Sequence, residues 1–389
     1  MKTRKLYYED CLLREFSAAV TGCEPVKNGY RITLDATAFY PEGGGQACDL
    51  GTLDDARVLD VQEQEGAVLH LCDQPLAVGS AVTGRLNWDR RFDLMQQHAG
   101  EHILSGLIHK RFGYHNVGFH VGKEVMEVDF DGPIPADALA ELEALANQAV
   151  WEDLPVRCWT PAPEELEQVC YRTKRPLPWP VRIVQFPGYD TCACCGIHVA
   201  RTGQIGLIKI LSCVKFHQGV RLEMVCGKRA YDYLCRIYDQ NKLVSQTLSA
   251  KALETGAAAL RVSEQLAAEK YRASLLEKQV FSAIAADYSG TDHPLHFQEG
   301  LSPASLRELT DAIANTCSGI AAVFSGTDAA GYSFCLISRR DDVLALGGAI
   351  IQELHGRGGG RSGAFQGSVK ATRKEIKALF DRFCQTDTP

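Results

Sequence analysis

The stretch Gln-His-Ala-Gly-Glu-His-Ile-Leu-Ser at residues 97–105 carries two histidines that are four residues apart, His98 and His102. On an α-helix this spacing places both imidazoles on one face, one turn apart, where they can bind the same metal ion. A histidine pair alone is also common on helix surfaces and in satisfied cores. The pair is surrounded by apolar residues that suit a helix packed on one side: Leu94, Ile103, Leu104 and Leu107.

A second pair with the same spacing lies far along the chain, where Cys194 and His198 belong to the run Cys-Cys-Gly-Ile-His. Zinc accepts both imidazole nitrogen and thiolate sulfur, so the two pairs together predict a zinc site. Four protein ligands would close a structural site, whereas a catalytic zinc keeps one position open. We therefore expect His198 to bind loosely, or to yield its place to water or substrate, if the site is catalytic.

Length and composition bound the class of protein. The 389 residues are too many for one ordinary core and predict two to four domains. The hydrophobic content of 46% and the charged content of 23% are typical of a soluble globular protein. No apolar run has membrane-spanning length, no signal core opens the chain, and the fifteen cysteines are odd in number and mostly scattered. We therefore expect a cytoplasmic protein in a reducing compartment, with no membrane partner.

The charge is unevenly distributed. A net charge of −7 argues against a general nucleic-acid binder. Residues 170–185, however, contain four basic residues and no acidic one, and the tail from Gln352 contains seven basic residues against four acidic ones. A phosphate-bearing partner could bind these patches, although a solvated face is the commoner explanation. The candidate nucleic-acid contacts are Arg172, Lys174, Arg175, Arg357 and Arg361.

The order of the predicted elements indicates an α+β protein. Residues 1–89 are β-rich, with strands such as Tyr30–Asp35 and Ala67–Cys72 bounded by turn residues. Residues 90–237 mix helices and strands and contain both metal-binding pairs.

The rest of the chain predicts a linker and a further domain. Residues 238–286 contain almost no helix breakers and predict a helical linker, weakest at Ser249–Gly256, where a hairpin is plausible. This linker can be a spacer or, with the C-terminal part, can hold a homodimer together. Residues 287–389 predict a small α/β domain whose glycine loop, Gly356–Gly363, contains two arginines and looks suited to approach phosphate.

Three consecutive glycines, Gly43 to Gly45, interrupt the β-rich part. Such a run allows close backbone approach to a ligand or to a neighbouring domain, and a plain flexible loop is the simpler explanation.

The run His98 to His102 also spells H-x-x-E-H, the signature of inverted zinc peptidases, in which Glu101 would be the general base. A thiolate ligand weakens the Lewis acidity that a peptidase needs, and Glu101 can equally be a solvent-facing helix residue. A non-enzymatic protein that binds tRNA or another partner, with a purely structural zinc, is the other alternative.

Several motifs together resemble the editing half of alanyl-tRNA synthetases. They are Thr-Ala-Phe-Tyr-Pro at 37–41 with Gly-Gly-Gly-Gln at 43–46, the two metal-binding pairs, and Gly-Val-Arg-Leu-Glu at 219–223. The likeness is greatest to the long form of the free-standing alanyl-tRNA editing proteins, the AlaX type. The C-terminal glycine loop is similar to the domain that ends such synthetases and also occurs on DHH-type phosphoesterases.

This resemblance implies a β-barrel-like domain at residues 1–89 and a zinc-dependent editing domain at residues 90–237. It implies hydrolysis of the ester that joins tRNA(Ala) to a wrong amino acid, chiefly serine, with glycine as a second candidate. Zinc would be the cofactor and mischarged tRNA(Ala) the partner. ATP binding is not expected, because no aminoacylation domain would fit in what remains.

The resemblance also implies roles for two residues of the N-terminal part. Thr37 and Gln46 would contribute to the amino-acid pocket, and the hydroxyl of Thr37 would recognise the hydroxyl of serine. The alternative for Thr37 is a strand-end threonine that hydrogen-bonds its own backbone.

Overall fold

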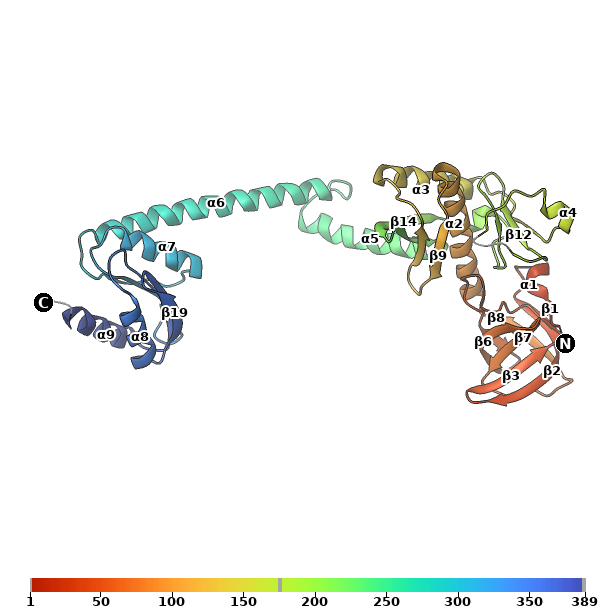
Figure 1. Ribbon diagram of the computed structural model, residues 1–389, viewed down its shortest axis with the longest axis horizontal. Helices are drawn as coiled ribbons and strands as arrows, with labels where there is room; N and C mark the ends of the chain where they lie inside the picture. Colours follow the sequence, from red (N-terminus) through yellow and green to blue (C-terminus); the bar gives the residue numbers. More distant parts are fainter. Residues whose placement is uncertain (1, 174–176, 387–389) are drawn as a thin grey trace. The chain divides into compact units, whose positions relative to one another are not determined.

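A computed structural model describes residues 2–173 and 177–386 (Figure 1). The chain divides into two compact units, Met1–Leu243 and Val244–Pro389, and each unit has its own hydrophobic clusters. Both units contain helices and strands, so the predicted mixed α and β class is confirmed. The four-part division at residues 89, 237 and 286 stays a prediction.

The first unit begins with strands that close on one another in the order β2-β3-β7-β6-β5-β8, and this closed set of strands is called the barrel below. Along β2 the side chains alternate between the inside and the solvent, and Phe16, Ala18 and Val20 are buried. The predicted strands Tyr30–Asp35 and Ala67–Cys72 correspond to β3 and β7. The strands are β2 Glu15–Val26, β3 Gly29–Leu34, β5 Gly51–Leu53, β6 Ala56–Gln64, β7 Ala67–Cys72 and β8 Ala81–Leu86, preceded by β1 Arg4–Lys5 and α1 Leu6–Glu9 and joined by β4 Ala36–Thr37, which pairs with β1.

Helix α2, Trp88–Phe112, is the central element of the first unit (Figure 1). The side chain of Asn87 caps its start by accepting a hydrogen bond from the backbone of Arg90, and Gly113 ends it in the left-handed conformation at φ 74°. Almost every residue in the middle of the helix is buried, because α2 packs against α3 and against strands of two sheets. Polar side chains on this helix therefore need partners inside the protein.

Two small sheets surround α2. One has the order β14-β15-β10-β9 and the other the order β11-β12-β13. Pro135 directly precedes α3. The elements are β9 Asn116–Val121, β10 Met126–Phe130, α3 Ala136–Trp151, β11 Arg157–Trp159, α4 Pro163–Leu166, β12 Ile183–Phe186, β13 Asp190–Ala193, a 3-10 turn at Thr202–Ile205, β14 Ile208–Phe216 and β15 Gly219–Cys226.

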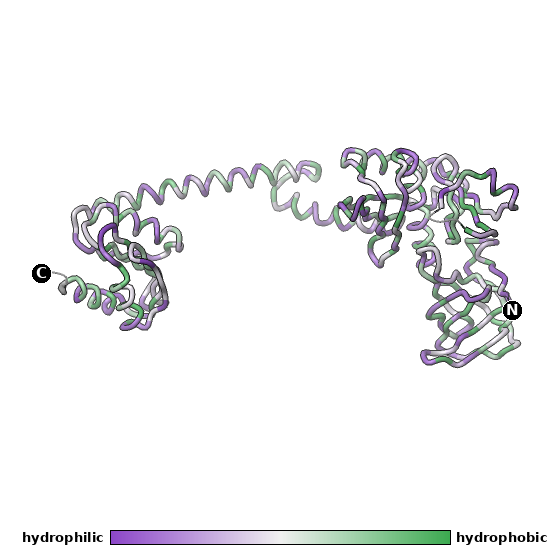
Figure 2. The backbone as a smooth tube through the Cα atoms, viewed as in Figure 1, coloured by the Kyte–Doolittle hydropathy of each residue, from purple (hydrophilic) through white to green (hydrophobic). Residues whose placement is uncertain are grey.

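Two helices occupy the region of the predicted linker. Helix α5, Gly227–Thr247, begins eleven residues before the predicted start, and α6, Thr255–Asp287, follows a break at the predicted weak point. Figure 2 shows hydrophilic and hydrophobic residues mixed along α6. Within the described part of the chain, no helix combines the length and the apolar content that crossing a membrane requires.

The second unit is a five-stranded sheet of order β16-β17-β18-β20-β19 with helices on both faces. Alternate residues of β17 face opposite sides, so Ala321 and Val323 pack with α6 and α7 while Ala322 and Phe324 pack with α8 and α9. The side chain of Ser302 caps the start of α7 by accepting a hydrogen bond from the backbone nitrogen of Ser305. The elements are β16 Leu295–Phe297, α7 Pro303–Ala314, β17 Ala321–Thr327, β18 Gly331–Ile337, α8 Leu344–Glu353, β19 Arg357–Arg361, β20 Ala364–Val369 and α9 Arg373–Thr386.

The C-terminal glycine run is not a loop. Residues Arg357 to Arg361 form β19, an exposed edge strand that pairs antiparallel with β20. The predicted loop is therefore wrong, because pairing with β20 satisfies a backbone whose composition disfavours a strand.

Candidate metal centre

Four side chains converge where α2 meets the segment after β13. His98 and His102 come from adjacent turns of α2, Cys194 directly follows β13, and His198 lies four residues further on. One donor atom of each lies within 4.8 Å of the others. The Sγ atom of Cys194 is 3.5 Å from Nε2 of His98 and 3.7 Å from Nε2 of His198. The group could hold a metal ion that prefers nitrogen and sulfur ligands.

The outer nitrogens of two of these histidines are held by acceptors. Nδ1 of His98 is 3.0 Å from Oε1 of Gln46, and Nδ1 of His102 is 2.9 Å from Oδ2 of Asp190. An amide oxygen and a carboxylate can only accept, so each Nδ1 donates its proton, and Nε2 is the atom that each ring presents to the cluster. Nε2 of His102 is buried and has no hydrogen-bond partner among the described residues, as expected of an atom that awaits a metal ion.

Gln46 connects the barrel to the cluster. Its Oε1 also accepts a hydrogen bond of 3.0 Å from the backbone nitrogen of Ile197, which fixes the orientation of the amide. The preceding glycines make this approach possible, since a Cβ atom on Gly44 would lie 2.9 Å from Sγ of Cys195 and one on Gly45 would lie 2.4 Å from the ring of Phe119. Both have positive φ angles, 61° and 82°. The glycine run therefore packs closely against residues far away in the sequence, and it is not the plain flexible loop that the sequence offered as the simpler explanation.

The charges around the cluster favour an ionised thiol. Burial alone would raise the pKa of Cys194, but His98, His198 and His102 outweigh burial and hold that pKa well below its usual value. Thiolate is the form that binds metals. The surroundings of Cys194 therefore favour the form of the thiol that can bind a metal.

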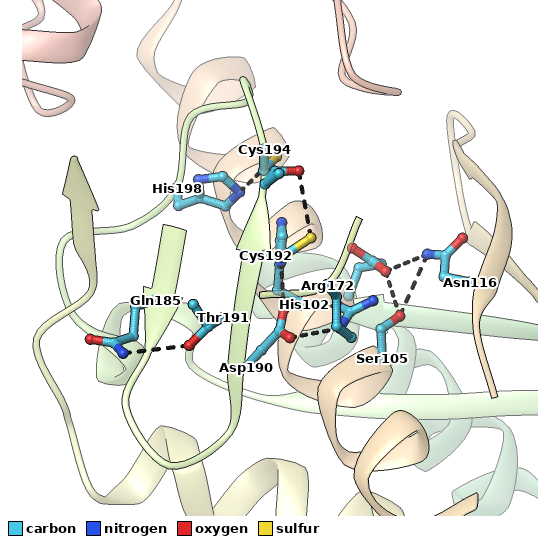
Figure 3. A network of polar contacts seen from close by, with 12 residues as sticks. His102, Ser105, Asn116, Arg172, Gln185, Asp190, Thr191, Cys192, Cys194 and His198 are labelled. Atoms are coloured by element: carbon cyan, nitrogen blue, oxygen red, sulfur yellow. Dashed lines mark hydrogen bonds and ion pairs between the residues drawn. The ribbon is translucent and has the colours of Figure 1, made fainter. Parts of the chain in front are cut away.

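Asp190 is itself held by Arg172. The guanidinium donates to both carboxylate oxygens, from Nε at 2.7 Å and from Nη2 at 2.8 Å (Figure 3). Burial would raise the pKa of Asp190, but hydrogen bonds from His102 and Arg172 lower it, so the carboxylate is charged. Asp190 is not among the site residues predicted from the sequence, although it lies four residues before Cys194, the same interval that separates Cys194 from His198.

The cluster borders a cavity of about 1230 Å³. Glu101 lies on its wall, only 5% exposed, and its Oε1 accepts hydrogen bonds of 2.5 Å from Ser105 and from Asn116. Glu101 is thus not the solvent-facing residue that the sequence allowed. Its role as a catalytic group stays a prediction.

A buried ion pair between the barrel and α2 is a second feature that the sequence did not reveal. Arg91 is fully buried, and its Nε and Nη2 donate to the carboxylate of Asp49, with Nη2 at 2.5 Å from Oδ2. Nη2 also donates to the backbone oxygen of Ala38, and Asp49 accepts from the backbone nitrogen of Tyr40. The pair thereby holds the segment that leads to Gln46. Arg91 lies two turns before His98 on the same face of α2, which is the one signal that could have suggested it.

Thr37 lies in the barrel, fully buried, and is not among the described residues that line the cavity. Its hydroxyl oxygen accepts from the backbone nitrogen of Phe39 at 3.1 Å, and its proton faces Nε2 of His70 at 2.9 Å. Nδ1 of His70 donates to the oxygen of Ile32, and burial lowers the pKa of His70 to about 4, so Nε2 is a neutral acceptor. The structure therefore gives Thr37 the local backbone bond that the sequence offered as an alternative.

The predicted nucleic-acid contacts belong to different units. Arg172 is paired with Asp190 beside the cluster. Arg357 and Arg361 lie at the two ends of β19 in the second unit, and both are exposed. Lys174 and Arg175 lie outside the described residues.

Two protein families match segments of the first unit. The family described as the threonyl and alanyl tRNA synthetase second additional domain matches residues 181–238, which contain Cys194 and His198. The family described as class II (A) tRNA synthetases matches residues 4–90.

Individual relatives extend the match to nearly the whole chain. An alanine–tRNA ligase of Ignicoccus hospitalis is 35% identical over 64% of this chain and 28% of its own length. One of Thermofilum pendens is 33% identical over 98% of this chain and 44% of its own length, so the chain spans less than half of either ligase. An alanyl-tRNA editing protein of Rattus norvegicus is 30% identical over 98% of both chains.

Proposed function

Because this chain belongs to the family of alanyl-tRNA editing proteins, we propose that it hydrolyses the ester between tRNA(Ala) and a wrong amino acid. The preferred amino acid is serine, with glycine as a second substrate. A synthetase pocket cannot strongly reject an analogue that merely adds a hydroxyl, so a second, hydrolytic site is needed to remove it. The matched ligases are longer than this chain, and their charging reaction is not part of the proposal.

The observation that carries the proposal is the convergence of His98, His102, Cys194 and His198 at the wall of a large cavity. Three imidazoles and a thiolate suit Zn²⁺, and the unpaired Nε2 of His102 fits a missing ligand bond. Zinc held here would either polarise the ester carbonyl and a water molecule or anchor the α-amino group of the substrate.

The surrounding residues have supporting roles in this proposal. Gln46 orients His98, and Asp190 orients His102 while Arg172 keeps Asp190 charged and in place. Such partners fix the ring orientation and raise the basicity of a ligand. Arg172 thus acts on the metal site rather than on tRNA phosphate. Arg357 and Arg361 remain the proposed tRNA contacts.

The proposal is tested by following the release of serine from seryl-tRNA(Ala). We expect the purified protein to hold about one zinc per chain and to deacylate this substrate. Cys194→Ser should lose both the metal and the activity, and a chelator should abolish the activity of the wild type. Cys213→Ser, at a partly buried cysteine outside the cluster, is the control and should behave as wild type.

The alternatives give different results in the same experiment. A zinc peptidase would cleave peptides and leave seryl-tRNA(Ala) intact. A protein with a purely structural zinc would bind tRNA without deacylating it. Full deacylation by protein stripped of metal would overturn the proposed role of zinc while leaving the editing function in place.

A further inference from the structure

The cavity beside the cluster is larger than an aminoacyl group requires. Its volume of about 1230 Å³ exceeds the roughly 300–1,000 Å³ of pockets that enclose whole drug-sized ligands. The part that extends beyond the cluster is lined by rings and apolar side chains, among them Tyr8, Trp159, Pro178 and Pro180. A flat, aromatic part of the substrate would fit such a wall.

Trp159 is the aromatic residue of this wall that has no stacking partner. It is the last residue of β11, opposite Ile183 of β12, and is half-buried. Within residues 2–173 and 177–386, no aromatic ring or cation stacks on it. The position of its backbone is fixed by the strand pair, so its ring is held on a rigid element at the cavity.

Tyr8 differs from Trp159 because its ring is already occupied. The guanidinium of Arg182 lies 4.6 Å from the centre of the Tyr8 ring, and Nζ of Lys5 lies 5.9 Å from it. The hydroxyl of Tyr8 donates to the backbone oxygen of Cys195 at 2.7 Å. Tyr8 thus holds the segment after β13, and Trp159 is left as the free ring.

The charge of this wall suits a phosphate next to the ring. Nη1 of Arg182 donates to the backbone oxygens of Cys194 and Gly196, at 2.9 and 2.8 Å, and no carboxylate pairs with Arg182 in the described part of the chain. Its positive charge is therefore not neutralised. The carboxylate of Asp131, which also lines the cavity, pairs with His115 instead.

We propose that Trp159 is a stacking platform for the terminal nucleobase of the tRNA acceptor end, with the charge of Arg182 beside the adjoining phosphate. The inference rests on the proposed function, because a hydrolase acting on aminoacyl-tRNA must hold the unpaired 3′ nucleotide that carries the ester. Base stacking on an aromatic side chain tolerates every base, since each has a π-face.

The test uses binding rather than hydrolysis. The probe is the uncharged trinucleotide cytidylyl-cytidylyl-adenosine, labelled at its 5′ end, and its affinity for the full chain is measured by fluorescence anisotropy. We expect Trp159→Ala to weaken binding about 10-fold, which corresponds to ~1.4 kcal/mol, and Trp159→Phe to keep most of the affinity. A trinucleotide without its terminal base should bind wild type and Trp159→Ala equally weakly.

Trp151→Ala is the matched control, because Trp151 is 70% exposed at the end of α3 and does not line the cavity. It should bind the trinucleotide as wild type does. Thermal unfolding of each variant reports folding separately, and if Trp159→Ala unfolds, Trp159→Leu takes its place, because it keeps an apolar side chain without an aromatic face and should weaken binding in the same way.

Failure of the inference and failure of the proposed function can be told apart. Equal affinity of wild type and Trp159→Ala for the trinucleotide, or no binding by wild type, would overturn the platform even if seryl-tRNA(Ala) is deacylated. Binding that depends on Trp159 without any deacylation would keep the platform and reject the hydrolase.

Discussion

Two glycine-rich stretches of this chain look alike in sequence but have different surroundings in the structure. Gly44 and Gly45 press against residues of other elements, so that a Cβ atom on Gly45 would clash with Phe119, and they bring Gln46 to the metal cluster. The glycines of β19 lie on an exposed sheet edge: a Cβ atom on Gly359 would meet nothing within 4 Å, and those on Gly358 and Gly360 would meet backbone oxygens of the paired strand β20, at 2.3 and 2.2 Å. A glycine run therefore signals close approach only when something packs against it, and the neighbours that decide this are far away in the sequence.

The largest expected effect comes from adding one methyl group to each stretch. Gly45→Ala forces an L-residue to φ 82° and places its Cβ at 2.4 Å from Phe119, so we expect it to lower the free energy of unfolding by roughly 2–4 kcal/mol and to weaken metal binding. Gly359→Ala should change stability by less than about 0.5 kcal/mol. Denaturant unfolding measures both, and equal effects would erase the distinction between the stretches.

The next largest effect is expected at Gln46, the residue that directly follows the first glycine stretch. Gln46→Leu removes the acceptor for Nδ1 of His98 and for the backbone of Ile197, and loss of such an outer partner lowers metal affinity about 10–100-fold. Competition with a chelator of known affinity measures the change. The control is Gln62→Leu on β6, an exposed residue whose amide contacts only surface carboxylates. If both variants hold the metal equally well, Gln46 does not support the site.

A smaller effect is expected just before the same stretch. Thr37→Val keeps the shape of the side chain but leaves the buried Nε2 of His70 without its donor, at a cost of about 1–3 kcal/mol of stability. The ratio of serine to alanine release from the two charged tRNAs should not change. A loss of that selectivity with unchanged stability would restore the sequence-based role of Thr37 as the reader of the serine hydroxyl.

The smallest effect is expected at the ends of the second stretch. Replacing Arg357 and Arg361 together by Ala should leave deacylation chemistry and stability as they are, and should weaken tRNA binding several-fold. The slope of log affinity against log salt should fall by about one for each phosphate that the variant no longer neutralises. An unchanged slope would mean that β19 does not contact tRNA.

Much of this site could be predicted because its ligands obey helix spacing. His98 and His102 are four residues apart on a helix, and Cys194 and His198 have the same spacing on a loop, so both pairs could be predicted. The partners behind them could not be found this way, because Asp190 and Gln46 reach the histidines through contacts that span 88 and 52 residues. Tertiary packing brings Asp190 and Gln46 to the histidines, and no spacing in the sequence shows which histidine each of them contacts.

The differences between the predicted and the observed secondary-structure elements have a similar origin. Gly227 begins α5 at φ 58°, directly after β15, so the helix follows the strand without the polar loop that a boundary search relies on. β19 is rich in a residue that disfavours strands, and only its pairing with β20 makes it one. In both cases local composition was outweighed by what lies next to the segment.

The ion pair between Arg91 and Asp49 has a consequence for synthesis on the ribosome. All strands of the barrel are synthesised before Arg91, which lies in the first turn of α2, so Asp49 at first lacks the counter-charge that it has in the folded protein. A buried carboxylate that lacks its partner costs about 3–5 kcal/mol, a large fraction of the stability of a small domain. We expect the nascent barrel to stay loosely folded until α2 has left the exit tunnel. Stalled chains in which only the strands up to Leu86 have left the tunnel, and chains in which α2 has left it as well, should then differ sharply in their resistance to protease.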